Sequence, residues 1–229
     1  MPYRPRYRKS YRPRRRYNRR RYARPKMSTM QLTTMLAKRA YNGVKYIKGL
    51  VNSEKHFRDF SSTDNIASSA WTVHSLCAIP IGDENYERTG NSVLLRGLNF
   101  KIQCDENASA TYTTTLKIVC VRDKQQVGDT APNGLDVFKS AHIDTYMAND
   151  QWGRFEVVFS KTVVLSAATG GGVSNRYISK FVPLQIHQRY NGPLAGDIQK
   201  NGYYLLLISN QSTNAPSVQV QCRTTFYDN

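Results

Sequence analysis

The chain has 229 residues, with 33 Lys or Arg against 16 Asp or Glu and a formal net charge of +17. Residues 1–52 hold 17 of the basic residues and no acidic one, so residues 53–229 hold 16 of each and balance to zero. No apolar run approaches the ~18 residues of a membrane span, and we expect neither a transmembrane helix nor a signal peptide. A positive charge concentrated in residues 1–52 indicates that the partner is a polyanion.

Residues 1–26 predict a disordered, nucleic-acid-binding arm. Aliphatic residues are almost absent, neighbouring arginines repel one another, and four prolines disfavour a helix. The Arg guanidinium donates paired hydrogen bonds to phosphate, and a Tyr ring offers a stacking surface to any unpaired base. The predicted contacts are Arg4, Arg6, Arg8, Lys9, Arg12, Arg14, Arg15, Arg16, Arg19, Arg20, Arg21, Arg24, Lys26, Tyr7, Tyr11, Tyr17 and Tyr22.

The same arm contains enough basic residues to serve as a nuclear-localisation signal, which would make host nuclear import machinery a partner. Such a signal needs only about 5 to 8 basic residues, so it does not account for the 13 present in residues 1–26. We therefore favour nucleic-acid binding as the main role of the arm.

Residues 27–52 predict a basic amphipathic helix or linker. Ser28 and Gln31 form a capping-box pattern, and apolar residues from Leu32 to Val51 recur at helical spacing on one face. Lys38, Lys45 and Lys48 fall opposite, where we expect them to contact phosphates while the apolar face packs on protein. A membrane-surface helix is the alternative reading.

Residues 53–229 predict an all-β domain, because hydrophobic residues alternate or form short continuous runs rich in β-branched and aromatic side chains. The eight predicted strands are Glu54–Ser61, Trp71–Ile79, Val93–Cys104, Tyr112–Arg122, Arg154–Leu165, Tyr177–Tyr190, Tyr203–Ser209 and Val218–Tyr227. The longest connection, residues 123–153, contains a predicted helical turn near 135–141. Eight strands with long, uneven loops favour an eight-stranded antiparallel jelly-roll sandwich.

The predicted core and the cysteines follow from the same runs. We expect Trp71, Leu98, Phe100, Ile118, Val157, Leu205, Val220 and Phe226 to be mostly buried. Cys77, Cys104, Cys120 and Cys222 lie in strand-like runs without a CxxC pair, which predicts packed, reduced thiols and no zinc site.

Several short motifs resemble the capsid proteins of small circular single-stranded-DNA (CRESS-DNA) viruses and the coats of satellite plant viruses. They occur in the order seen in that family and cover nearly all of residues 54–229. The matching segments are Glu54–Phe57, Arg88–Asn91 with Val93–Leu98, Val121–Gln125 followed by Pro132 and Asp136–Phe138, Arg154–Phe155 with Ser160–Lys161, and Arg223–Asp228. Ser160 departs from the pattern, since Asp is frequent at that position.

This resemblance implies a jelly-roll subunit that assembles into an icosahedral shell, T=1 with 60 copies, around a single-stranded genome, with DNA favoured over RNA. It also implies a virion protein that enters the host nucleus during assembly, and a cell-surface receptor as a further partner. Loop aromatics suit subunit contacts, and we expect Tyr86, Tyr146, Trp152 and Tyr190 to serve as interface anchors.

No catalytic motif or metal-ligand spacing stands in a suitable context, so we expect neither enzymatic activity nor a cofactor. Asp83, Glu84 and Glu87 cluster in one loop and raise the possibility of a divalent-cation site at a subunit contact, although a solvated acidic loop is the better reading. Two other classes stay open at this stage: a cellular single-stranded nucleic-acid-binding or chromatin protein that forms no shell, and a membrane-active toxin.

Overall fold

The computed structural model describes residues 28–50, 54–128, 130–148, 150, 153–167 and 174–228, with only the backbone described for 45–50. The chain divides into two units, residues 1–52 and 53–229. In the first unit, α1 (Thr29–Leu50) forms where the helical spacing predicts it. Its capping box is also confirmed, because the Ser28 hydroxyl accepts from the Gln31 amide and the Gln31 side chain accepts from the Ser28 amide.

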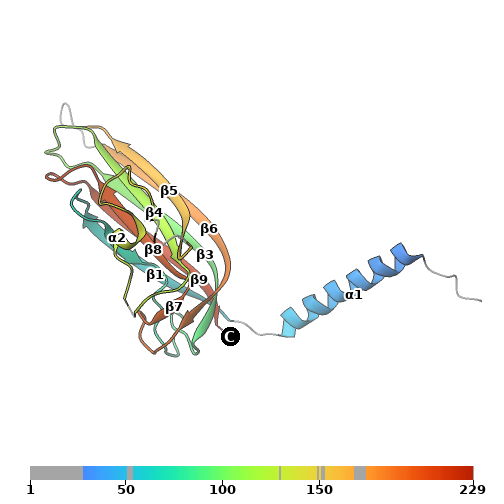
Figure 1. Cartoon of the computed structure of the whole chain (residues 1–229). Coiled ribbons are helices and arrows are strands. Elements are labelled where there is room, and N and C mark those ends of the chain that lie inside the picture. Colours follow the sequence, from blue (N-terminus) through green and yellow to red (C-terminus); the bar gives the residue numbers. More distant parts are fainter. Residues whose placement is uncertain are drawn as a thin grey trace, which may run out of the picture. The chain divides into compact units, whose positions relative to one another are not determined.

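The second unit is a sandwich of two antiparallel sheets, as predicted (Figure 1). One sheet has the order β1-β9-β3-β6-β7, and the other has the order β2-β8-β4-β5. Successive strands pass from one sheet to the other except at the β4–β5 step and at the short added strand β7, which pairs with β6; this is the connectivity of a jelly roll. The five-stranded sheet comprises β1 (Lys55–Asn65), β9 (Ser217–Asp228), β3 (Ser92–Asp105), β6 (Asn175–Tyr190) and β7 (Ile198–Lys200). The four-stranded sheet comprises β2 (Thr72–Ser75), β8 (Gly202–Ser209), β4 (Thr114–Asp123) and β5 (Phe155–Leu165).

The main core lies between the two sheets. Leu98, Phe100 and Ile102 point inward from β3, and Val220 and Phe226 point inward from β9. This strict alternation follows from the period of two in the sequence, since successive side chains on a strand point to opposite faces. Six of the eight predicted core residues lie here, namely Leu98, Phe100, Ile118, Leu205, Val220 and Phe226.

A second core covers the outer face of the four-stranded sheet. The connection between β4 and β5 folds back over this face and carries α2 (Gly134–Val137), seen over β8 in Figure 1. Val137 and Phe138 from this connection pack with Tyr204, Leu206 and Ile208 of β8. Every residue of β8 is therefore buried, which explains why its sequence is continuously apolar rather than alternating.

Trp71 belongs to this second core rather than to the core between the sheets. Its ring stacks on Phe138 with centroids 4.5 Å apart, and its indole N–H donates to the Ser140 carbonyl. Gly134 makes the approach possible, because a Cβ at this position would lie 2.2 Å from the Trp71 Cβ. The glycine therefore fixes how closely α2 seats on the sheet.

Three details differ from the sequence prediction. Val157 is 39% exposed, so its assignment to the core is wrong; β5 is the last strand of its sheet, and a bulge at Cys120/Val121 shifts the register beside it. The three-residue strand β7 was missed because it lies in a stretch expected to be loop. The helical turn begins earlier than predicted, at Gly134, where Asn133 caps it.

We predict that Gly134→Ala lowers the free energy of unfolding by about 2 kcal/mol, because the added methyl overpacks the contact with Trp71. Urea unfolding followed by tryptophan fluorescence measures this change. Gly90→Ala is the matched control, since a Cβ there meets nothing within 4 Å. Equal stability of the two variants would contradict the proposed role of Gly134.

Candidate nucleic-acid and assembly surfaces

The predicted phosphate contacts fall into two groups. All of those in residues 1–26 lie outside the described residues, so the arm remains a prediction. In α1, Lys38 is exposed, and the side chains of Lys45 and Lys48 are not described. The apolar positions Leu32, Leu36 and Val44 are about half exposed, so the expected packing of this face on protein stays a prediction as well.

The four predicted interface aromatics have different outcomes. Tyr86 is 46% exposed and Tyr146 is 81% exposed, so both are accessible on loops, whereas Trp152 lies outside the described residues. Tyr190 is wrong as an interface anchor, because it is only 3% exposed and its hydroxyl donates to the Cys77 carbonyl inside the subunit. Burial raises the pKa of Tyr190 well above its ordinary value, so the phenol stays neutral at physiological pH.

Tyr190 instead forms part of a clamp around Arg88, which the sequence does not identify as a structural centre. Arg88 is fully buried, and its guanidinium lies 3.9 Å from the Tyr190 ring centroid. It donates to the carbonyls of Ile79 and Gly90 in the β2–β3 connection and of Gly192 in the β6–β7 connection. Burial lowers the pKa of Arg88, but the four-way hydrogen bonding keeps the charge solvated by peptide dipoles. One side chain thus ties together the loops at one end of the sandwich.

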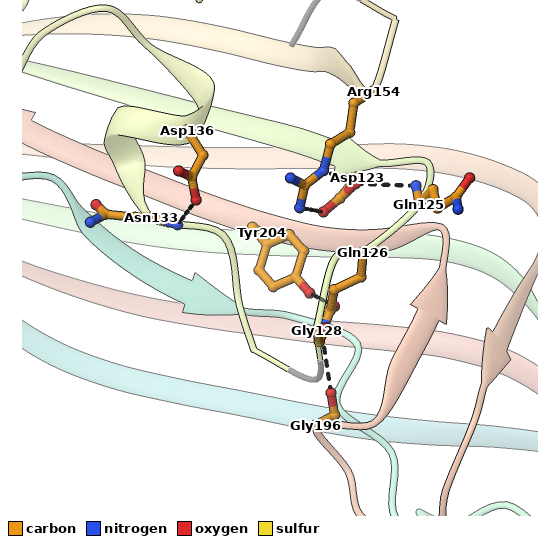
Figure 2. Close-up of polar contacts among 9 residues, drawn as sticks. All are labelled: Asp123, Gln125, Gln126, Gly128, Asn133, Asp136, Arg154, Gly196 and Tyr204. Carbon is orange, nitrogen blue, oxygen red and sulfur yellow. Dashed lines mark hydrogen bonds and ion pairs between the residues drawn. The ribbon is translucent and has the colours of Figure 1, made fainter. Parts of the chain in front are cut away.

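The long β4–β5 connection is fixed at its base by a buried ion pair (Figure 2). The Arg154 guanidinium donates two hydrogen bonds to the Asp123 carboxylate, at 3.0 Å and 2.7 Å, and Asp123 is fully buried. Asp123 also accepts from the Gln125 amide, at 3.1 Å. This bidentate bond raises the pKa of Arg154, which therefore stays charged.

Two further contacts in Figure 2 hold this connection against other parts of the body. The Tyr204 hydroxyl of β8 donates to the Gln126 side-chain oxygen, and the Gln126 amide group lies 3.5 Å from the Gly196 carbonyl in the connection after β6. Asn133 and Asp136 complete the capping box of α2. These contacts hold the connection against the outer face of the four-stranded sheet. Side chains on its outer surface, such as Leu135 and Tyr146, are exposed.

The acidic loop at 83–87 gives no sign of a cation site. The Glu87 carboxylate accepts from the Glu84 amide at 3.1 Å, which is an ordinary turn contact. Within the described ranges, no group of three His, Cys, Asp or Glu is placed to hold a metal ion. In the same part of the chain, no helix is long and apolar enough to cross a membrane.

The four cysteines are free and buried, which agrees with the prediction of packed thiols. Burial raises the pKa of Cys104 and of Cys222 to about 12, and it raises the pKa of Cys77 and Cys120 further. Since the thiolate is the reactive form, we expect these buried side chains to be unreactive in the folded subunit.

Neither a family model nor a curated protein matches the sequence. Among solved structures, the chain is similar to desmodium yellow mottle tymovirus, with 9% identity, coverage of 77% of this chain and 88% of that chain, and a TM-score of 0.33. It is also similar to turnip yellow mosaic virus, at 12% identity, 77% and 82% coverage and a TM-score of 0.35. It is also similar to an empty virus-like particle of cowpea mosaic virus, at 13% identity, with coverage of 74% of this chain and 78% of that chain and a TM-score of 0.29. Because these TM-scores are low, we draw no functional conclusion from them.

We predict that Asp123→Asn lowers the free energy of unfolding by about 3 kcal/mol, because it leaves the Arg154 charge unpaired in a site that is 17% exposed. Urea unfolding measures the loss, and faster proteolysis between residues 124 and 153 should accompany it. Glu156→Gln is the control: it breaks the more exposed pair with Arg122 and should cost less than about 1 kcal/mol. An Asp123 variant as stable as this control would contradict the anchoring role.

We also predict that the native protein does not react with a thiol reagent at pH 8. A thiol with a pKa of about 12 is ionised in roughly one molecule in ten thousand at that pH. The raised pKa keeps the thiols protonated until the pH approaches it, so reactivity should rise only under strongly alkaline conditions or on unfolding. In denaturant all four should react without prior reduction; fewer than four would indicate a disulfide.

Proposed function

We propose that this chain is a viral capsid protein whose jelly-roll body forms an icosahedral shell and whose segment 1–52 packages a single-stranded genome. The observation that carries the proposal is the division of charge along the chain. All 17 net positive charges precede a body that is neutral in sum and folds around its own two cores. Genome neutralisation and shell formation are thereby assigned to separate segments.

The body suits assembly because its strand edges and loop tips offer contacts that a single copy leaves open. β1, β7, β2 and β5 are the outermost strands of the two sheets. Tyr86, Tyr146 and Leu194 project from loops and are 46%, 81% and 68% exposed. Such side chains bury large apolar areas at little entropic cost when subunits meet. We propose Tyr86, Tyr146 and Trp152 as contact residues between subunits.

The arm suits packaging of a single strand. Arginine forks bind phosphate, and tyrosine rings stack on unpaired bases without selecting a sequence. If the shell is T=1 with 60 copies, segment 1–52 supplies 17 charges per copy, or roughly a thousand in total, enough to offset a strand of about a thousand nucleotides. We propose DNA as the genome, Lys38, Lys45 and Lys48 as supporting phosphate contacts, and nuclear import through the same basic arm.

Deleting residues 1–26 tests the packaging role. The truncated protein should form particles or subunits that carry little nucleic acid, because 13 of the 17 basic residues of segment 1–52 are lost. The measurement is the ratio of absorbance at 260 and 280 nm in purified particles, with negative-stain images to record whether shells form. Equal nucleic-acid content with and without the arm would refute this role, and a full-length protein that stays monomeric with nucleic acid present would refute the shell.

Substitution of the arm arginines separates charge from hydrogen-bond geometry. Replacement by Lys keeps the charge and loses the paired donors, so packaging should weaken less than on replacement by Gln. The Lys version therefore serves as the matched control for the Gln version.

A further inference from the structure

The outer face of the five-stranded sheet is the one sheet face that no described segment covers with a second core. The strand register places the same-face residues in rows across β1, β9, β3 and β6. One row contains Asp59, Arg223, Asn99 and Phe181, and the next contains Ser61, Gln221, Lys101 and Ser179. Apart from the aromatic side chains, these residues are polar or charged, as a face in contact with water requires.

This face is strongly basic although the body as a whole is neutral. Its cations are Lys55, Arg96, Lys101, Arg189, Lys200 and Arg223, and its only acids in the described rows are Asp59 and Asp105. Asp59 is neutralised by Arg223 through two hydrogen bonds of 2.7 Å and 2.6 Å, which lower the pKa of Asp59. Asp105 accepts from the Gln103 side chain. The face thus keeps a net charge of about +4.

On the opposite side of the body most cations near the strands have partners, although Lys139 is exposed and has no ion pair among the described residues. Arg122 and Lys124 pair with Glu156, Arg154 pairs with Asp123, and Lys117 donates to the Ile143 carbonyl under the covering loop. By contrast, Arg96, Lys101 and Arg189 are exposed and form no ion pair among the described residues. Charges left unpaired on one face are available to an external anion.

Exposed aromatic rings stand among these cations. Phe57 is 41% exposed, Phe181 58% and Tyr177 70%. Arg223 lies over the Phe57 ring at 5.7 Å from its centroid, and Phe181 is seated on Gly97, where a Cβ would lie 2.7 Å from the ring. The same face carries a hollow of about 390 Å³, lined in part by Asp59, Asn99, Lys101, Gln221 and Arg223. Phe57 and Phe181 thus have packing partners on the face that also carries this polar hollow.

We infer that this face is a second binding surface for single-stranded nucleic acid, with Arg96 and Lys101 contacting phosphates and Phe57, Tyr177 and Phe181 stacking on bases. Interleaved cations and aromatic rings are the combination that binds single strands without sequence preference. An isologous contact, in which this face meets the same face of a second copy, is disfavoured because it would bring like charges together. The inference rests on the proposed packaging function for the identity of the polyanion. It implies that the outer face of the five-stranded sheet faces the packaged strand.

The first test compares two double variants of the full-length protein. Arg96→Gln with Lys101→Gln removes two charges from the face, and Lys124→Gln with Lys139→Gln removes two from the other side. Binding of a fluorescent poly-thymidylate strand is followed by anisotropy at several salt concentrations. Since each single-strand phosphate contact contributes about 0.7 to the salt dependence, the face variant should lose about 1.4 from the slope and bind roughly twenty-fold more weakly at 0.1 M salt. The control should match the wild type, and equal slopes for both variants would overturn the inference.

The second test does not depend on the variants folding. Ultraviolet cross-linking of wild-type protein to the same strand, followed by peptide mass spectrometry, should identify Phe57, Tyr177 or Phe181 in addition to tyrosines of residues 1–26. Cross-links confined to residues 1–52 would overturn the second surface while leaving the packaging function intact. A wild-type protein that does not bind the strand would overturn the packaging function itself, so the two failures are distinguishable.

Discussion

The body depends on the burial of β8 from both sides. Leu205 and Leu207 face the core between the sheets, and Tyr204 and Leu206 face the second core beneath the β4–β5 connection. A strand that is apolar on both faces needs a cover on each, because leaving one face in water forfeits much of the free energy of its burial. The five-stranded sheet supplies one cover, and the long connection with α2 supplies the other. The connection therefore has a structural role as the outer cover of β8, and the Asp123–Arg154 pair at its base keeps it in place.

This arrangement decides which surface of the sandwich remains open. With the four-stranded sheet covered by the connection, the five-stranded sheet is the one whose outer face no second core covers in the described part of the body. The acids of the body lie mainly in loops or pair with cations on the covered side, as Glu156 does with Arg122. Among the described residues, Arg223 is the one cation of the open face with an acidic partner. A net charge of zero for residues 53–229 therefore conceals a basic sheet face, which the composition alone does not reveal.

The sequence predicts most of the fold because hydrophobic period is a local property. A strand forms within each of the eight predicted runs, although β2 occupies only Thr72–Ser75 of the predicted Trp71–Ile79. The alternation from Val218 to Phe226 assigns the inward face of β9 residue by residue. The predictions that failed depend on contacts between residues far apart in the sequence. Nothing in the neighbourhood of Val157 or Tyr190 reveals that one lies in an outermost strand while the other packs against Arg88. Arg88 itself appears as a motif residue, and its three carbonyl partners become apparent only when separate connections meet. The basic face is equally non-local, since it is assembled from β1, β3, β6, β7 and β9.

The body and the arm differ in what stabilises them: burial of apolar side chains for the body, and compensation of charge for the arm. The body reaches a folded state by burying its own apolar side chains, and its charges balance. The arm has almost nothing to bury and repels itself, so only an external polyanion compensates its charge. Residues 1–52 lead directly into β1, an outermost strand of the basic sheet. If both proposed segments bind one strand, their covalent connection would raise the effective concentration of the second contact once the first has formed. Ionic strength should then control packaging through both segments at once, while leaving the two apolar cores that hold the subunit together largely unaffected.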